Sequence, residues 1–228
     1  MMERRAQRPL TLSREALASG AIRRFVEAHS HIETRSPAEL AASLRSALAG
    51  RDLSGGVWLF AYGSLIWNPL IHVAERRLGT VYGYHRRFCI WSELGRGSPE
   101  RPGLVLALDH GGACRGVLLR VAPERVESEL DVIWQREMLT SVYRARWLPV
   151  RSAAGPVEAL AFTVNRAHSR YAGRLSEERI LDAIAAAEGP IGRCADYLIE
   201  TVASLRDLGI CEPGLAALND RLAARGGA

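Results

Sequence analysis

The spacing of apolar positions predicts a helical first part of the chain, followed by a part rich in strands. Residues 13–29 have a helical pattern and predict one helix. A second helix is predicted to begin at Ser36, because Pro37 stands at the first helical position and Glu39 three residues after the capping Ser. Its apolar residues recur every fourth position until Gly50 ends the helix.

The run Val57–Ala61 is apolar, contains β-branched and aromatic residues and has no helix or strand breaker. It predicts a strand buried on both faces. Tyr62, Gly63 and Ser64 follow directly, and Gly63 lets the backbone turn tightly because it has no Cβ. Two interpretations remain open: an ordinary turn from strand to loop, or a turn whose N–H groups face a ligand.

Further strands are predicted from β-branched and aromatic runs between turn signals. Residues 76–84 and 86–91 predict two strands joined near Gly83. Residues 104–108 and 114–121 predict a hairpin whose turn is His110-Gly111-Gly112, and residues 142–150 and 157–164 predict another strand pair. Three helices are predicted after that pair: one capped by Ser176, one between the Gly189–Gly192 break and Gly209, and one over 212–224.

The helix predicted from Pro123 to about Glu137 carries an acidic residue on its apolar face. At about 100° per residue, Glu137 falls in the same arc as Val126, Leu130 and Ile133. Glu129 lies at the flank of this arc, and the other acidic residues of the helix lie on the opposite, solvated side. A buried carboxylate with a raised pKa suits a general base. The alternative is that Glu137 ends the helix at the surface or pairs with a nearby Arg.

Composition describes an ordinary globular protein of one domain. The chain has 228 residues, 48% hydrophobic and 24% charged, and a formal net charge of +5. No apolar run approaches the roughly 20 residues of a membrane span. The Arg-rich start, residues 1–12, is expected to be a basic tail, and because no apolar segment follows Met1 to Pro9, a signal peptide is not expected and the cytoplasm is favoured. Basic residues are spread along the whole chain, which argues against nucleic-acid binding.

Common catalytic motifs are missing from the sequence. Ser64 has Tyr62 two residues before it, so it is not in a G-x-S-x-G elbow, and no phosphate-binding glycine loop is present. His29 and His31 are expected at the solvated surface, and the histidines have no metal-binding spacing. The four cysteines lack C-x-x-C spacing and are interpreted as reduced thiols. A glycine turn and one carboxylate on an apolar face therefore remain as the candidate chemistry.

Several separated motifs in the right order resemble the ChaC-like γ-glutamylcyclotransferases. They are FAYGSLIWNP, YHRRFCIWSELGRGSPERPGLVLALD, CRGV, WQREM and EGPIGRCADYL. The resemblance covers residues 57–209, so residues 1–50 are interpreted as a tail and helical extension and residues 51–228 as the family domain, together one compact unit. It implies an α+β fold, in which a small mixed β-barrel is decorated with helices, and an enzyme without a cofactor.

The family is known for cleaving glutathione to 5-oxoproline and cysteinylglycine, a lyase reaction of glutathione catabolism. By position, the resemblance implies that Glu137 is the catalytic glutamate and that Tyr62, Gly63, Ser64 and Leu65 form the loop that binds the γ-glutamyl group. Tyr143 and Tyr171 resemble substrate-binding tyrosines of the family. Ile191 and Cys194 depart from the Ser and Asn expected in a GPSGRN-like segment, and this puts polar contacts from that segment in doubt.

The chemistry of such a substrate requires no nucleophile from the enzyme, since the α-amine can attack the γ-carbonyl of its own residue. Glu137 would then act as base and acid, and the Gly63 turn would bind the oxyanion. Arg86 and Arg87 are candidates for binding substrate carboxylates or for a role on the strand surface. Three alternatives stay open: cyclisation of other γ-glutamyl amines or dipeptides, a catalytically silent ligand-binding module, and a basic nucleic-acid binder.

Overall fold

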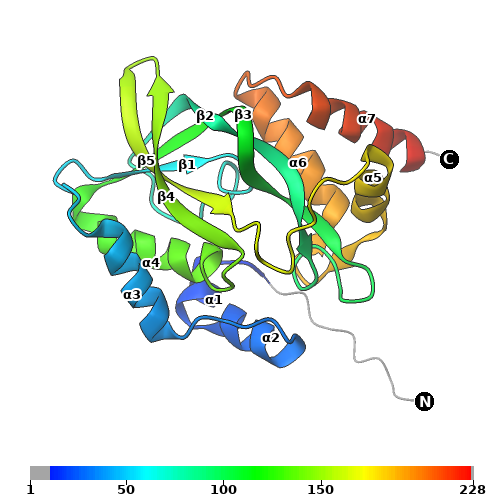
Figure 1. Ribbon diagram of the computed structural model, residues 1–228, viewed down its shortest axis with the longest axis horizontal. Helices are drawn as coiled ribbons and strands as arrows, with labels where there is room; N and C mark the ends of the chain where they lie inside the picture. Colours follow the sequence, from blue (N-terminus) through cyan, green and yellow to red (C-terminus); the bar gives the residue numbers. More distant parts are fainter. Residues whose placement is uncertain (1–10, 227–228) are drawn as a thin grey trace.

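A closed five-stranded β-barrel forms the centre of the protein (Figure 1), in a computed structural model that describes residues 11–226. The strand order is β1 (Val57–Ala61), β3 (Gly103–Val121), β2 (Glu75–Ser92), β4 (Tyr143–Ser152) and β5 (Gly155–Val164). Neighbouring strands are antiparallel except that β5 runs parallel to β1 and β3, which closes the barrel. The predicted mixed barrel is thereby confirmed.

The predictions for β2 and β3 placed turns where the structure has bulges. Residues 75–92 form one strand and residues 103–121 form another, and the two pair with each other along almost their whole length. Gly83, Gly111 and Gly112 all have positive φ and lie opposite one another, at a break in the register between the two strands. The predicted turn at His110-Gly111-Gly112 is therefore wrong, as is the division of β2 near Gly83, because the glycines let both strands bend together.

Helices cover the barrel in two groups (Figure 1). The first group consists of α1 (Arg14–Ala18), α2 (Ala21–His29), α3 (Pro37–Leu48) and α4 (Val126–Glu137), and a 3-10 turn, η1 (Pro123–Arg125), precedes α4. The second group consists of α5 (Glu177–Ala186), α6 (Cys194–Asp207) and α7 (Pro213–Gly226), and it lies beside β3. A short hairpin of two strands with two residues each, β6 (Glu188–Gly189) and β7 (Gly192–Arg193), separates α5 from α6.

The first predicted helix, over residues 13–29, is two helices in the structure. Gly20 has φ 70° and acts as the N-cap of α2, so the chain turns between α1 and α2. A left-handed residue interrupts a helix, and glycine adopts that conformation without a Cβ clash. The capping box of α3 is confirmed, since the Ser36 side chain accepts a hydrogen bond from the Glu39 N–H and Glu39 accepts one from the Ser36 N–H. Most of the predicted basic tail over 1–12 lies outside the described residues.

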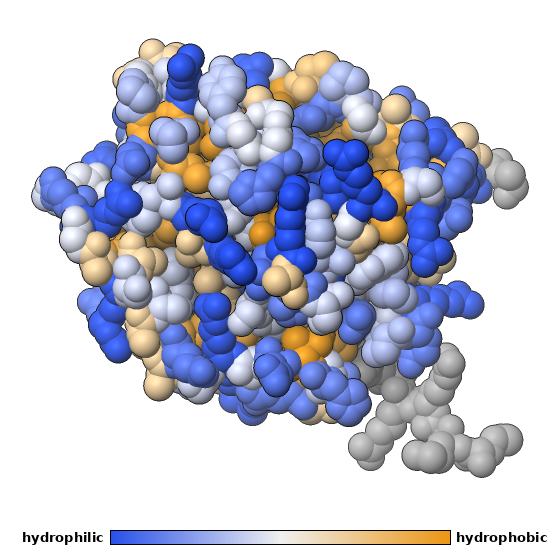
Figure 2. Space-filling model, viewed as in Figure 1, coloured by the Kyte–Doolittle hydropathy of each residue, from blue (hydrophilic) through white to orange (hydrophobic). Residues whose placement is uncertain are grey.

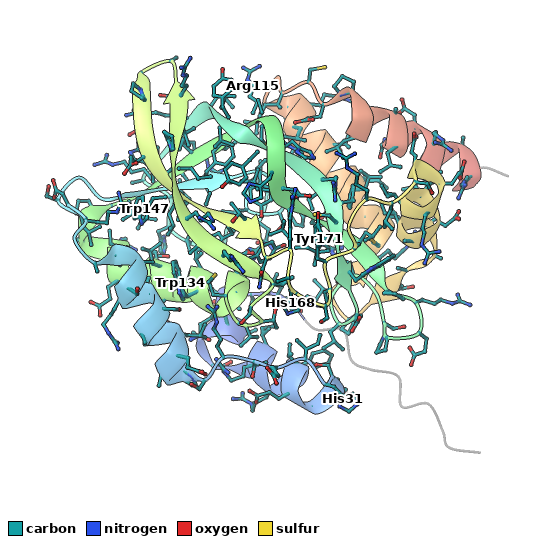
Figure 3. The ribbon with its side chains drawn as sticks, viewed as in Figure 1. His31, Arg115, Trp134, Trp147, His168 and Tyr171 are labelled. Atoms are coloured by element: carbon teal, nitrogen blue, oxygen red, sulfur yellow. The ribbon has the colours of Figure 1, made fainter. Side chains whose placement is uncertain are left out.

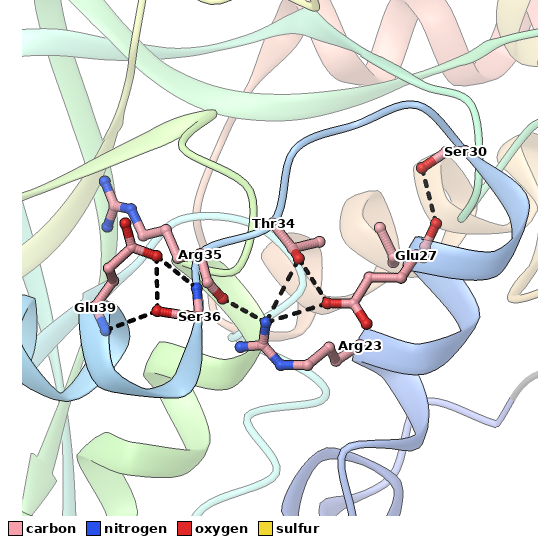
Figure 4. Close-up of polar contacts among 8 residues, drawn as sticks. Arg23, Glu27, Ser30, Thr34, Arg35, Ser36 and Glu39 are labelled. Atoms are coloured by element: carbon pink, nitrogen blue, oxygen red, sulfur yellow. Dashed lines mark hydrogen bonds and ion pairs between the residues drawn. The ribbon is translucent and has the colours of Figure 1, made fainter.

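Polar contacts fix the connection between α2 and α3 (Figure 4). The Arg23 guanidinium donates to the Arg35 carbonyl and contacts Glu27 and Thr34. Farther along, α3 is tied to the rest of the protein by two indole N–H groups (Figure 3): Trp134 of α4 donates to Ser43 and Trp147 of β4 donates to the Ala47 carbonyl, each at 2.8 Å. These bonds hold the N-terminal helices against α4 and the barrel.

One large hydrophobic cluster joins the N-terminal helices to the barrel. It includes Leu17 and Leu40 from α1 and α3, Leu130 from α4 and Leu119 from β3, each at most 2% exposed. Figure 2 shows mostly hydrophilic residues on the viewed face, with apolar residues only in small separate patches. Within residues 11–226, no helix has the length and apolar character that crossing a membrane requires.

The cysteines and histidines lie largely as the sequence predicts. Cys89, Cys114 and Cys194 are buried free thiols, whereas Cys211 is a free thiol at the surface. Most of the six histidines, His29 and His31 among them, are exposed. In the described part of the chain, no group of three or more His, Cys, Asp or Glu side chains is placed to hold a metal ion.

Candidate active site

A cavity of about 240 Å³ opens at the end of the barrel where β1 ends and β4 begins. Tyr62 directly follows β1, and Tyr143 begins β4 opposite Val164, the last residue of β5. All the predicted site residues except Tyr171 line this cavity: Tyr62, Gly63, Ser64, Leu65, Glu137 and Tyr143. Residues that are far apart in the sequence therefore come together because the barrel closes.

The turn after β1 resembles the first turn of a helix. The Ile66 N–H donates to the Gly63 carbonyl at 2.9 Å, and the Asn68 N–H donates to the Ser64 carbonyl at 2.8 Å. In such a turn the first N–H groups have no partner within the turn and are available to an anion. A Cβ on Gly63 would lie 3.1 Å from the Tyr197 hydroxyl, so glycine allows the turn to pack closely against Tyr197.

Glu137 is the last residue of α4, and its side chain is only 12% exposed. Burial raises the pKa of its carboxyl group, and the neighbouring Arg136 guanidinium, whose Nε lies 3.0 Å from Oε1, partly opposes that rise. The carboxylate is therefore both buried in the cavity wall and paired with an Arg. Such an environment moves the pKa of a glutamic acid toward the range of a general base at neutral pH.

Arg136 connects the carboxylate to the turn. Its guanidinium donates to the Ser64 hydroxyl oxygen at 2.8 Å and to the Asn68 carbonyl, in addition to pairing with Glu137. Because the Ser64 hydroxyl accepts this bond, it is held as part of the cavity wall. Because Arg136 bonds both Glu137 and Ser64, it also fixes the position of Glu137 relative to the N–H groups of the turn.

Three tyrosines surround this centre, of which Tyr62 and Tyr197 are buried and Tyr143 is partly buried. Tyr62 donates to the Phe162 carbonyl at 2.7 Å, and Tyr143 donates to the Leu106 carbonyl at 3.3 Å. Burial raises the pKa of each hydroxyl, as it does for Tyr197, and the negative charge of Glu137 adds to the rise. All three hydroxyls therefore stay protonated at neutral pH.

Tyr171 lies outside the cavity, on the loop that follows β5 (Figure 3). Its hydroxyl donates to the buried Asp109 carboxylate at 2.9 Å, and Arg87 pairs with the same carboxylate at 3.1 Å. Arg86 is buried and pairs with Glu212 at 3.0 Å. The structure thus does not bring Tyr171, Arg86 or Arg87 to the predicted site. The other prediction for Arg86, a role on the strand surface, is also wrong, because its side chain is buried.

The cavity also has walls formed by residues that the sequence pattern does not single out. Arg96, Arg136 and Tyr197 contribute polar groups, and α1 and α2 contribute Leu17 and Ile22. Arg96, Arg136 and Tyr197 all stand within the quoted motifs, so the signal was present, but no periodicity distinguishes them from their neighbours. Nothing in the sequence of α1 and α2 indicates that these helices pack on the cavity.

The two departures from the family pattern have structural roles. Ile191 adds an apolar side chain to the cavity wall. Cys194 is fully buried, where its thiol donates to the Leu104 carbonyl at 3.0 Å and accepts from the Leu104 N–H at 3.3 Å. Cys194 therefore ties the start of α6 to β3 and makes no contact with the cavity.

Comparisons with known proteins show the family and the fold of this chain. Residues 57–224 match the family described as ChaC-like protein. The chain is 41% identical over 176 residues to a glutathione-specific γ-glutamylcyclotransferase of Escherichia coli K12, covering 77% of this chain and 76% of the relative. It is 34% identical over 148 residues to the human glutathione-specific γ-glutamylcyclotransferase 1, covering 63% and 67%. A yeast γ-glutamylcyclotransferase specific to glutathione has the same fold, with a TM-score of 0.68 at 20% identity, covering 75% of this chain and 96% of the yeast chain.

Proposed function

Since this chain belongs to the ChaC-like protein family, we propose that it is a glutathione-specific γ-glutamylcyclotransferase that releases 5-oxoproline and cysteinylglycine. One observation carries the proposal. The buried Glu137 carboxylate, with its raised pKa, lines the same cavity as the turn from Tyr62 to Leu65. A base and a set of N–H donors facing one cavity are what cyclisation of a γ-glutamyl amide needs.

In the proposed reaction the substrate supplies the nucleophile. Glu137 takes a proton from the α-ammonium group, and the freed amine attacks the γ-carbonyl carbon and closes a five-membered ring. The N–H groups at the start of the Gly63 turn stabilise the oxyanion of the tetrahedral intermediate. The amide C–N bond then breaks as the departing amine takes the first proton back from Glu137. Glu137 also carries the second proton of the ring nitrogen to that amine, so the products are a neutral lactam and an ammonium group.

The walls of the cavity support this sequence of steps. Arg136 holds Glu137 in place, and the apolar residues Leu65, Ile191 and Phe162 limit the access of water. A dry site strengthens the attraction between the developing oxyanion and its donors. Tyr143, whose protonated hydroxyl lies beside Glu137, is proposed to contact the substrate.

The test is the release of 5-oxoproline from glutathione by the purified protein and by Glu137→Gln. We expect the variant to lose about 10²- to 10⁴-fold in kcat, because amide and carboxyl side chains have the same shape but only the carboxylate accepts a proton. Glu127→Gln, at an exposed position of the same helix, is the matched control and should keep full activity. Unchanged turnover by Glu137→Gln would show that another group is the base.

A further inference from the structure

Arg96 is a cationic side chain in the cavity that the proposed mechanism does not use. It lies on the loop between β2 and β3, and its side chain is 14% exposed. The guanidinium carbon lies over two aromatic rings, 6.0 Å from the centroid of Trp67 and 5.8 Å from that of Tyr197. Aromatic faces attract a guanidinium and hold its plane in one orientation.

The hydrogen-bonding groups of Arg96 are only partly used. One nitrogen donates to the Arg193 carbonyl at 3.1 Å, and another lies 3.7 Å from a carboxylate oxygen of Glu200, too far for a hydrogen bond. The Glu200 side chain is 48% exposed, so water screens this pair. A guanidinium has five N–H groups in a fork that fits a carboxylate. Arg96 thus retains donors for an anionic ligand, in contrast to Arg136, which bonds Glu137, Ser64 and Asn68.

The loop that carries Arg96 is held rigidly by close contacts between glycines. A Cβ on Gly97 or Gly103 would collide with backbone atoms of the other side of the loop, and a Cβ on Gly189 would collide with the backbone of Gly95 and Gly97. The Ile191 N–H donates to the Gly95 carbonyl at 3.0 Å. The β6–β7 hairpin therefore clamps the loop, and a clamped loop presents a charged side chain in a preorganised position.

A γ-glutamyl peptide such as glutathione has two carboxylates at different distances from the reacting amine. The α-carboxylate shares a carbon atom with the α-amine, so it stays beside Glu137 while that residue takes the proton. The C-terminal carboxylate lies on the other side of the amide bond that breaks. Arg96 contacts Arg193 and Glu200, both exposed, and within residues 11–226 it makes no hydrogen bond or ion pair with Glu137, which places it at the outer rim of the cavity.

We propose that Arg96 binds the C-terminal carboxylate of the peptide that leaves in the reaction. This assignment rests on the proposed function and adds the basis of its substrate preference. The Arg96 fork holds the far end of the substrate while Glu137 and the Gly63 turn act on the γ-glutamyl end. Substrates whose leaving group has no carboxylate, such as simple γ-glutamyl amines, lose this contact.

The test compares glutathione with its glycine monoethyl ester, which differs in having no C-terminal carboxylate. We expect the wild-type protein to favour glutathione by about 10- to 100-fold in kcat/KM, the range that a hydrogen-bonded charge pair contributes. Arg96→Gln should lose that preference through a higher KM for glutathione, with kcat/KM for the ester nearly unchanged. Arg96→Lys, which keeps the charge but not the fork, should retain part of the preference.

Arg101→Gln is the matched control, because it removes the same charge at an exposed position of the same loop. It should keep the wild-type preference, and thermal melting of each variant reports whether the loop still folds. Equal rates of the wild-type protein on glutathione and the ester would overturn the assignment, even if Arg96→Gln failed to fold. So would an equal loss on both substrates in folded Arg96→Gln. Release of no 5-oxoproline from either substrate by the wild-type protein would instead reject the proposed function itself, and this assignment with it.

Discussion

The pairing of Glu137 with its chain neighbour Arg136 sets the acid–base behaviour of the site. Burial of the carboxyl raises its pKa, and the Arg136 charge lowers it, with burial the stronger of the two effects. A group that must take a proton and return it in one turnover works best when its pKa lies near the working pH. Burial therefore makes the carboxylate more basic than an ordinary glutamate, and the Arg136 charge limits that rise.

Removing the Arg136 charge should move the pH dependence of the reaction. In Arg136→Gln the pKa of Glu137 rises further, because only the effect of burial remains. With a higher pKa, Glu137 becomes protonated, and therefore unable to act as a base, at a higher pH. The acidic limb of the kcat/KM profile should shift to higher pH accordingly. The measurement is 5-oxoproline release across pH for the wild type and the variant.

Arg144→Gln serves as the control for this profile, since Arg144 is an exposed arginine near the start of β4. Arg136→Gln also loses the bond to Ser64, so its maximal rate is expected to fall. The position of the limb is the decisive readout. A limb that stays in place would mean that a group other than Glu137 controls it.

At the level of single residues, the sequence predicts the site residues that differ in character from their immediate neighbours. Glu137 interrupts an apolar arc, and Gly63 interrupts an apolar run, so both stand out from their surroundings. Arg96 and Arg136 do not, because an arginine in a loop or at a helix end has the same local pattern whether it faces solvent or a cavity. Only the closed barrel and the clamped loop decide which way these side chains point.

At the level of elements, α1 is attached to the rest of the protein through a buried carboxylate. Glu129 of α4 is 1% exposed, pairs with Arg14 of α1, and accepts a bond from the His72 N–H at 3.1 Å. Arg14 also donates to the carbonyl of Leu70, which has a positive φ of 59°. Burial acts to raise the pKa of Glu129, but the bonds from Arg14 and His72 outweigh it and the pKa lies below its ordinary value.

Breaking this attachment should loosen the wall that α1 adds to the cavity. We expect Arg14→Gln to lower the free energy of unfolding by about 2 kcal/mol, because a buried carboxylate loses its counter-ion while Arg14 itself is partly exposed. The KM for glutathione should rise, since Leu17 of α1 lines the cavity. Urea unfolding, hydrogen exchange of α1 and 5-oxoproline kinetics measure the three effects.

Arg24→Gln is a suitable comparison, since Arg24 lies on α2, makes no ion pair within residues 11–226 and bonds the Ser19 carbonyl at the surface. It should change neither stability nor KM by much. If Arg14→Gln lowered stability but left KM and the exchange of α1 unchanged, α1 would not shape the substrate site.

The boundaries of elements were hardest to predict where glycine serves two purposes. Gly83 and the pair Gly111-Gly112 have the composition of hairpin turns, but they form bulges because both strands bend at the same level. Gly20, in contrast, breaks a helix that the apolar pattern alone would continue. In each case the element that packs against the glycine decides whether it forms a turn, a bulge or a helix break. The local sequence holds no information about that neighbouring element. Helices with explicit caps, such as α3 and α5, were predicted closely for the opposite reason.

At the level of the whole molecule, a buried polar cluster joins three parts of the chain near the closure of the barrel. Asp109 of β3 is 0% exposed and binds Arg87 of β2 together with Arg166 and Tyr171 of the loop after β5. The neighbouring residue Leu108 pairs with Thr163, where β3 meets β5. The cluster therefore holds the loop after β5 against β2 and β3.

Asp109→Asn should destabilise the whole fold. Burial acts to raise the pKa of Asp109, but the bonds from Arg166 and Tyr171, the His110 N–H and the Arg87 charge outweigh it and lower the pKa. A lowered pKa contributes stability above the ordinary Asp value of about 3.9 and loses it as pH falls through the folded value. At pH 7 we expect the free energy of unfolding, measured with urea, to fall by about 3 kcal/mol in the variant. The difference in stability between the variant and the wild type should become smaller below about pH 4.

Tyr171→Phe separates a structural role of this cluster from a role in substrate binding. The variant removes one hydroxyl and leaves the Asp109 carboxylate bound to Arg87 and Arg166, so the loss of stability should be only about 1 kcal/mol. Because the hydroxyl bonds Asp109 outside the cavity, the KM for glutathione should stay at the wild-type value. Tyr143→Phe, whose hydroxyl lies in the cavity beside Glu137, is the contrasting variant and should raise KM. A higher KM in Tyr171→Phe with unchanged stability would place Tyr171 among the substrate contacts, as the family resemblance implies, and would require the loop after β5 to move when substrate binds.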